Sequence, residues 1–186
     1  MNGRVSLAIA LALLFCTAGS HASQCNKWRL GGSYSQFTDS STLDRLGDAW
    51  GVIGEYSFYD ALQEDMDRIT GDVSLFVYYR RYDSDFRGVD FTGNYTSIGL
   101  RWRGGRGALP SCDGFYGGVG LACAILRISP SMDILSNTQS ETKLEWSGFL
   151  GVNFADRLYA EVGYTQVPDL SDFGFGSLTF TAGLRF

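Results

Sequence analysis

Apolar and polar or small side chains alternate without a break over the last ten residues of the sequence, SLTFTAGLRF. Successive side chains of a β-strand point to opposite faces. One face of such a strand would be apolar and the other would contact water. The apolar face would carry Leu178, Phe180, Ala182, Leu184 and Phe186. A strand with one face for lipid and one for water is typical of a transmembrane β-barrel.

The first residues have the features of a cleaved signal peptide. Arg4 supplies a positive charge, 7–15 is apolar, and Ser20-His21-Ala22 offers small residues for cleavage before Ser23. A helix that crosses a bilayer needs about 20 apolar residues, so the segment 7–15 is too short to span. We therefore predict a signal peptide over 1–22 and a single barrel domain over 23–186.

Period-two segments of roughly ten residues, the length that a tilted membrane strand needs, recur along the whole of this domain. They fall near 27–37, 49–60, 70–82, 93–103, 114–127, 142–154, 157–166 and 176–186. Their even number predicts an all-β fold, an eight-stranded antiparallel up-and-down transmembrane β-barrel. The short turn 155–157 and both chain ends would face the periplasm. The polar stretches 38–48, 83–92, 128–141 and 167–175 would be exterior loops.

Aromatic residues on the outward parity gather at the ends of these segments, as the interfacial belts of a membrane barrel require. The belt residues are Trp28, Trp102, Phe154 and Phe186 at one end and Trp50 and Trp146 at the other. A soluble lipocalin-like barrel, with the apolar parity facing a core, is the alternative that isolated strands leave open. In that case the protein would be a periplasmic carrier.

The opposite parity carries the ionisable side chains and would line the barrel interior. We expect a lumen ion-pair network of Arg29, Glu55, Arg80, Arg101, Lys143, Glu145, Glu161 and Arg185, with Asp72 and Arg103 on the same parity. Eight strands leave room only for side chains, so Glu55 and Glu161 would pair with Arg101, Arg185 or Arg80. This favours a charged, plugged lumen. A narrow passive channel for ions or small solutes is the alternative, because charges at membrane depth often mark a path.

The strand count, the alternation and the charged interior resemble the small eight-stranded outer-membrane β-barrel family of the OmpX, attachment-invasion and OmpA-barrel types. The ending Leu184-Arg185-Phe186 looks like the signal that the barrel-assembly machinery recognises, with Phe186 as its last residue. The resemblance implies residence in the outer membrane among its lipids and lipopolysaccharide. It also implies a structural or surface-interaction role.

Catalysis, metal binding and cofactor binding are not expected. The one histidine, His21, lies inside the predicted signal peptide, so the mature chain has no imidazole base for hydrolysis. We expect no catalytic residues, no metal site and no cofactor. Cys25 and Cys112 would lie on the same side of the barrel in an oxidising compartment, where a disulfide between them could form. Cys123 would be a small lipid-facing side chain.

The predicted exterior loops are strongly acidic. They hold Asp39, Asp44, Asp48, Asp83, Asp85, Asp90, Asp133, Glu141, Asp169 and Asp172. Such a surface could bind divalent cations shared with lipopolysaccharide phosphates, or a basic surface protein. It disfavours nucleic acid. We therefore expect a monomeric barrel protein of the outer membrane that is not an enzyme.

Overall fold

The computed structural model describes residues 27–38, 47–61, 70–86, 89–106, 108, 113–130, 139–155, 157–170 and 173–186. Eight strands account for nearly all of them. The strands are β1 (Trp28–Phe37), β2 (Ala49–Ala61), β3 (Thr70–Phe86), β4 (Val89–Gly105), β5 (Gly114–Pro130), β6 (Gln139–Phe154), β7 (Leu158–Leu170) and β8 (Phe173–Arg185). In the described residues no helix is long and apolar enough to cross a membrane.

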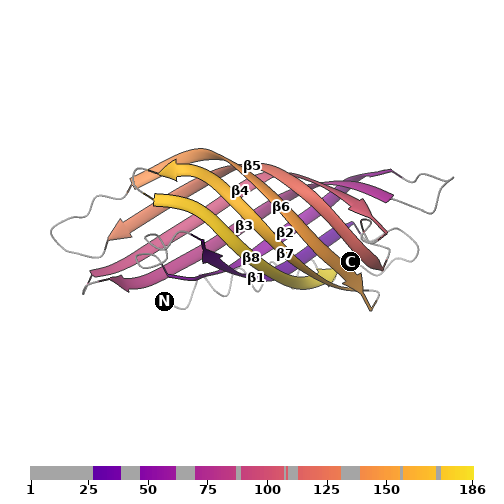
Figure 1. Ribbon diagram of the computed structural model, residues 1–186, viewed down its shortest axis with the longest axis horizontal. Coiled ribbons are helices and arrows are strands. Elements are labelled where there is room, and N and C mark those ends of the chain that lie inside the picture. Colours follow the sequence, from indigo (N-terminus) through magenta and orange to yellow (C-terminus); the bar gives the residue numbers. More distant parts are fainter. Residues whose placement is uncertain are drawn as a thin grey trace.

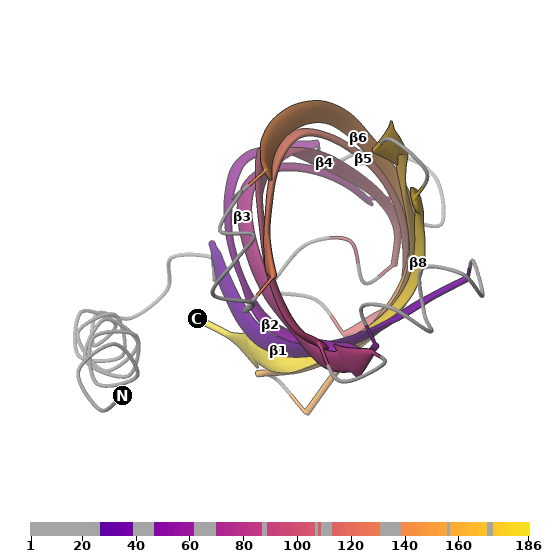
Figure 2. The same cartoon turned by 90° about the vertical axis from the view of Figure 1, so that its left-hand side faces the viewer.

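The strands form one closed antiparallel barrel in chain order, with β8 paired to β1. Figure 1 shows them running obliquely around the long axis, and Figure 2 shows the closed ring along that axis. The main chains of Trp28 and Phe186 exchange two hydrogen bonds, with N···O distances of 2.8 and 3.0 Å. The eight-stranded antiparallel barrel predicted from the sequence is therefore confirmed.

Side chains alternate between a buried interior and an exposed outer wall along every strand. In β1, for example, Arg29, Ser33 and Ser35 are buried, whereas Trp28 and Gly32 are exposed. The large apolar residues of the outward parity are exposed, including Leu150 at 67%. A continuous apolar outer wall around a buried polar interior is the pattern of a barrel that lies in lipid.

The two ends of the barrel differ in their connections. One end, which we call the terminal end, contains Trp28, Phe186 and the connections that follow β2, β4 and β6. The other end, which we call the loop end, contains the connections that follow β1, β3, β5 and β7. The predicted signal peptide 1–22 and both Cys25 and Cys112 lie outside the described residues.

The strands extend farther toward the loop end than the sequence analysis expected. The stretch 83–92, predicted to be a loop, is mostly paired strand, with Asp83 opposite Thr92 and Phe86 opposite Val89. The expected loops 128–141 and 167–175 are shortened in the same way by β5, β6, β7 and β8. Beyond the lipid a strand can continue with polar residues on both faces. The alternation used to find the strands therefore ends before the strands do.

Glycines on the inner wall make room for large rings. A Cβ atom on Gly183 would lie 2.7 Å from Cε1 of Tyr159 and 2.5 Å from the Cα atom of Gly31 in the neighbouring strand. A Cβ on Gly118 would lie 2.5 Å from Cζ of Phe149. Because any larger residue would collide there, these glycines allow bulky side chains to lie flat against the neighbouring strand.

Candidate functional site

The centre of the barrel holds a cluster of buried charges. Arg101 on β4 donates from Nη1 to Glu55 Oε1 of β2 at 2.7 Å and to Glu161 Oε2 of β7 at 3.0 Å. All three side chains are less than a tenth exposed. Since β2, β4 and β7 lie on different parts of the wall, this arginine joins strands that do not pair with one another.

Arg103, two residues farther along the same face of β4, binds more carboxylates than Arg101. Its guanidinium pairs with Glu55, with Asp72 Oδ2 at 3.0 Å and with Glu161 Oε1 at 3.6 Å. It also donates to Ser74 Oγ at 2.8 Å. Arg103 and Asp72 are fully buried. We call Glu55, Asp72, Arg101, Arg103 and Glu161 the central ion-pair cluster.

Arg29 supplies a third cation close to this cluster. It lies directly opposite Glu55 in the pairing of β1 with β2, and its Nη2 donates to the carbonyl oxygen of Ala108 at 3.0 Å. Its guanidinium lies 5.0 Å from the centre of the Tyr116 ring. With Arg29 included, three cations face three carboxylates, so the charges of this central group balance.

Aromatic side chains surround these charges. Tyr116 donates to Glu161 Oε1 at 2.8 Å, and the guanidinium of Arg101 lies 4.5 Å from the ring centre of Phe149 and 5.0 Å from that of Phe76. Guanidinium groups over aromatic faces are stabilised by cation–π attraction. These rings were not predicted from the sequence, where only the ionisable residues of the inward parity stood out.

Arg80 and Glu145 belong to a second polar group, nearer the loop end. Arg80 donates to Ser177 Oγ at 2.9 Å, and its guanidinium lies 4.0 and 4.9 Å from the ring centres of Tyr78 and Tyr95. Tyr95 in turn donates to Glu145. Arg80 forms no ion pair with a carboxylate of the described ranges. Tyrosines therefore surround the cation and connect it to Glu145.

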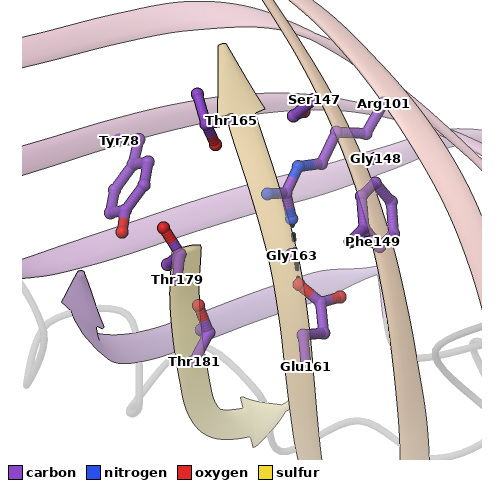
Figure 3. Close-up of a pocket in the computed structure, with 10 residues that line it drawn as sticks. All are labelled: Tyr78, Arg101, Ser147, Gly148, Phe149, Glu161, Gly163, Thr165, Thr179 and Thr181. Carbon is purple, nitrogen blue, oxygen red and sulfur yellow. Dashed lines mark hydrogen bonds and ion pairs between the residues drawn. The ribbon is translucent and has the colours of Figure 1, made fainter. Parts of the chain in front are cut away.

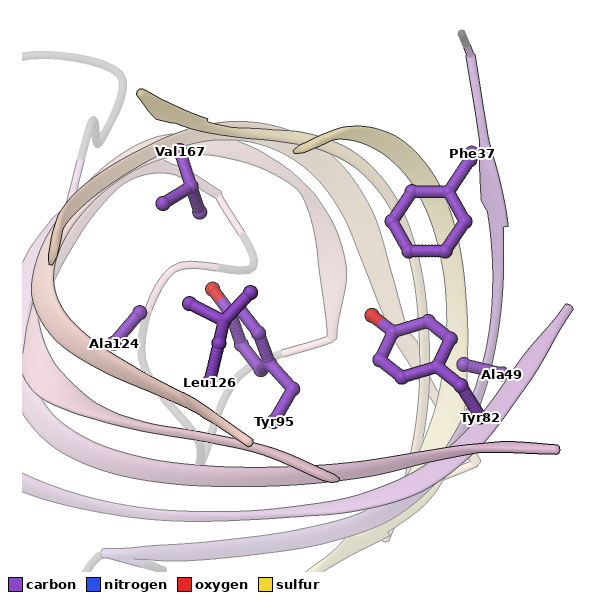
Figure 4. Packing of buried hydrophobic residues seen from close by; sticks show 7 residues of the cluster. All are labelled: Phe37, Ala49, Tyr82, Tyr95, Ala124, Leu126 and Val167. Carbon is purple, nitrogen blue, oxygen red and sulfur yellow. The ribbon is translucent and has the colours of Figure 1, made fainter. Parts of the chain in front are cut away.

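An apolar cluster lies inside the barrel at the loop end (Figure 4). It consists of Phe37, Ala49, Tyr82, Tyr95, Ala124, Leu126 and Val167, all at most 5% exposed. The rings of Phe37 and Tyr82 are stacked, with centres 4.9 Å apart. This cluster was not predicted from the sequence, although every member lies on the inward parity of its strand. We call it the loop-end apolar cluster.

A small polar cavity lies beside the Arg101 and Glu161 ion pair of the central cluster (Figure 3). Hydroxyls of Tyr78, Thr165, Thr179 and Thr181 line it together with the Arg101 and Glu161 ion pair. About 10 Å³ is open to the centre of a water-sized sphere, roughly the space of one water molecule. This cavity therefore has no room for a larger solute.

Two residues of the predicted network lie apart from the centre. Lys143 pairs with Glu141 at 3.1 Å, and both are about one third exposed. Arg185, a candidate partner of the mid-barrel glutamates, instead donates from Nη2 to Asp113 Oδ1 at 2.6 Å, at the terminal end. Sequence parity indicated the correct face for each side chain, but not its height along the barrel axis.

The predicted belt residues lie on the outer wall. Trp28, Trp50, Trp102, Trp146 and Phe154 are 40%, 70%, 53%, 52% and 42% exposed. Phe186 is partly buried and hydrogen-bonds through its main chain to Trp28. Cys123 has a free thiol and is exposed on the same wall.

Only part of the predicted acidic surface can be placed. Asp48 accepts a hydrogen bond from the Tyr34 hydroxyl, and Asp83 accepts from Arg81 Nε at 2.8 Å. Asp39, Asp44, Asp133 and Asp172 lie outside the described residues. Within the part of the chain that the structure describes, no three His, Cys, Asp or Glu side chains are grouped so that they could hold a metal ion.

Comparison with known proteins gives the family. No curated protein matches the chain. The N-terminal β-barrel domain of Pseudomonas aeruginosa OprF superposes with a TM-score of 0.65 at 18% identity, covering 88% of this chain and 100% of that one. Ail, the attachment invasion locus protein of Yersinia pestis, superposes with a TM-score of 0.51 at 17% identity, with the same coverage. At these identities the likeness concerns the fold alone. The family model described as "Outer membrane protein beta-barrel domain" matches residues 8–186, and the chain belongs to this family.

Proposed function

We propose that this protein is a monomeric structural or surface-interacting barrel of the outer membrane whose lumen does not conduct. The observation that carries the proposal is the set of buried side chains inside the barrel. The central ion-pair cluster and the loop-end apolar cluster occupy successive levels of the barrel. The cavity beside the Arg101 and Glu161 ion pair has room for about one water molecule.

In this proposal the terminal end faces the periplasm and the loop end faces the exterior, after removal of a signal peptide at 1–22. Supporting this orientation, β3 and β4 continue at the loop end to the pair Phe86 and Val89, beyond Arg81, which lies opposite the belt residue Trp50. Barrels of the outer membrane extend farther from the membrane on the exterior side than on the periplasmic side. Phe186, on that side, would be recognised by the barrel-assembly machinery. The surrounding partners would be outer-membrane lipid and lipopolysaccharide.

A narrow channel is the second candidate, and one observation favours it. Hydroxyl side chains follow one another along the inner wall of β1, β7 and β8. They include Ser33, Ser35, Thr165, Ser177, Thr179 and Thr181, all buried. If the arginines above and below this wall moved, the hydroxyls could solvate a small ion.

Two measurements on protein from the outer-membrane fraction test the proposal. The first compares the gel mobility of boiled and unboiled samples, because a closed barrel keeps its compact shape in detergent until it is heated. We expect a shift. Recovery of the protein in the soluble periplasmic fraction with no shift would contradict the membrane role and favour a soluble carrier.

The second measurement is conductance in a planar bilayer, with a protein-free bilayer containing the same detergent as the control. We expect no stable openings, since Arg101 and Arg103 are held by three carboxylates across the lumen. Reproducible unitary steps from heat-modifiable protein would overturn the non-conducting proposal and establish the channel.

A further inference from the structure

A row of hydrogen-bond donors crosses three neighbouring strands on the outer wall near the loop end. Arg81 of β3 lies directly opposite Asn94 of β4, and Asn94 lies directly opposite Arg127 of β5. Adjacent strands are about 4.8 Å apart, so the two arginines are anchored about 10 Å from each other with the amide between them. We call these three residues the basic row.

Local hydrogen bonds orient the row toward the surroundings of the barrel. Arg81 Nε donates to both carboxylate oxygens of Asp83, at 3.1 and 2.8 Å, while its side chain remains 55% exposed. Asn94 Oδ1 accepts from the Tyr79 hydroxyl at 2.7 Å, which leaves the Asn94 amide nitrogen as a donor. Arg127 is exposed. All three side chains can therefore donate to an acceptor outside the protein.

The basic row lies at the level where a lipid headgroup would be. Trp50 of the aromatic belt is directly opposite Arg81 in the pairing of β2 with β3, and Tyr79, also outward, is two residues nearer the barrel centre. Belt aromatics mark the boundary between acyl chains and headgroups. The row starts at this boundary and continues toward the loop end.

The charges around the row are unevenly distributed. At the loop end, the outward-facing arginines and lysines of the described residues are Arg81 on β3 and Arg127 on β5. Asp83 is the described carboxylate in contact with the row. In the main chain, the next acidic pair in the register, Asp85 opposite Asp90, is four residues beyond Arg81, or about 13 Å along the strand.

We propose that the basic row binds the phosphate group of a membrane lipid at the loop end of the barrel. The inference rests on the proposed membrane role and adds a specific headgroup contact to it. Guanidinium groups bind phosphate oxygens through paired, charge-assisted hydrogen bonds. The guanidinium groups of Arg81 and Arg127, on either side of the Asn94 amide, can together bind an anionic headgroup that carries one or two phosphates.

The test compares lipid binding by barrels purified in detergent, counted by native mass spectrometry during titration. The probes are a diphosphorylated lipid A and its monophosphorylated form. The test variant is R81Q/R127Q. The matched control is R106Q/R157Q, which removes the same charge from exposed positions at the terminal end. Each preparation is first checked for the mobility shift on boiling.

We expect R81Q/R127Q to bind the diphosphorylated lipid more weakly, by about tenfold for each arginine, while the control binds like the wild type. The wild type should also prefer the diphosphorylated probe. Equal binding by R81Q/R127Q and wild type, or an equal loss in the control, would overturn the inference while the mobility shift still supports the barrel. Absence of the shift in the wild type would count against the membrane role itself.

Discussion

Replacing Arg103 with methionine should destabilise the barrel more than any other single change to its charged interior. Arg103 is fully buried and contacts Glu55, Asp72 and Glu161. Without it, Glu55 and Glu161 keep Arg101 as a partner. Asp72 Oδ2 keeps only the Ser57 hydroxyl, at 3.2 Å. The variant therefore leaves the buried carboxylate of Asp72 without its ion-pair partner.

The expected magnitude follows from that unpaired charge. Removing one partner of a buried ion pair costs about 3–5 kcal/mol. With a urea dependence of about 2 kcal/mol per molar, the midpoint of unfolding from lipid vesicles should fall by about 2 M. Tryptophan fluorescence of Trp28, Trp50, Trp102 and Trp146, all exposed on the outer wall, reports the transition.

Two further variants separate this mechanism from a general loss of packing. R103M/D72N removes the unpaired carboxylate and should recover part of the lost stability, which a double-mutant cycle measures as coupling. R106Q, at an exposed position, should change stability by less than about 0.5 kcal/mol. An R103M midpoint equal to that of the wild type, or no recovery in the double variant, would refute the reasoning.

The other predictions concern the inner wall and the terminal end. Gly183→Ala should cost about 1–3 kcal/mol, because its Cβ would meet the Cα atom of Gly31 at 2.5 Å. Gly32→Ala, the same change where no atom lies within 4 Å, should leave the urea midpoint unchanged or slightly higher; equal losses in the two variants would contradict the collision. Arg185→Leu should lower the midpoint by less than half the R103M effect, since its partner Asp113 is 48% exposed and can be solvated by water. A shift as large as that of R103M would mean that Arg185 stabilises the interior directly.

The sequence predicted the fold because the membrane leaves few alternatives. Lipid on one face and a wet interior on the other impose the alternation that is visible in Leu178, Phe180 and Leu184, and closure requires an even strand number in such barrels. Strand positions near the lipid were accurate. Beyond the belts, as at Asp83 and Thr92, both faces meet water, so nothing in the sequence distinguished strand from loop.

The ion pairs were harder to predict than the face on which they lie. Parity places Arg101, Arg103 and Arg185 on the inner wall, but their partners depend on the stagger between strands, which a single sequence does not give. The stagger brings Glu161 of β7 to Arg101 of β4 and takes Arg185 to Asp113. The loop-end apolar cluster was missed for another reason. Phe37 and Leu126 are apolar residues on the inward parity, which is otherwise polar. Nothing in the sequence indicates that such residues lie at the same height along the barrel axis.

Closure by β1 and β8 has a consequence for how the chain reaches its folded state. Ser35 and Thr179, which hydrogen-bond across this pair, are 144 residues apart in the sequence. In all the other strand pairs, the two strands follow one another in the sequence. Until β8 has been made, β1 has an unpaired edge, and such edges invite pairing with other chains. Contacts between such distant segments also form slowly. A partly synthesised chain therefore keeps this edge of β1 open until the final strand is available to pair with it.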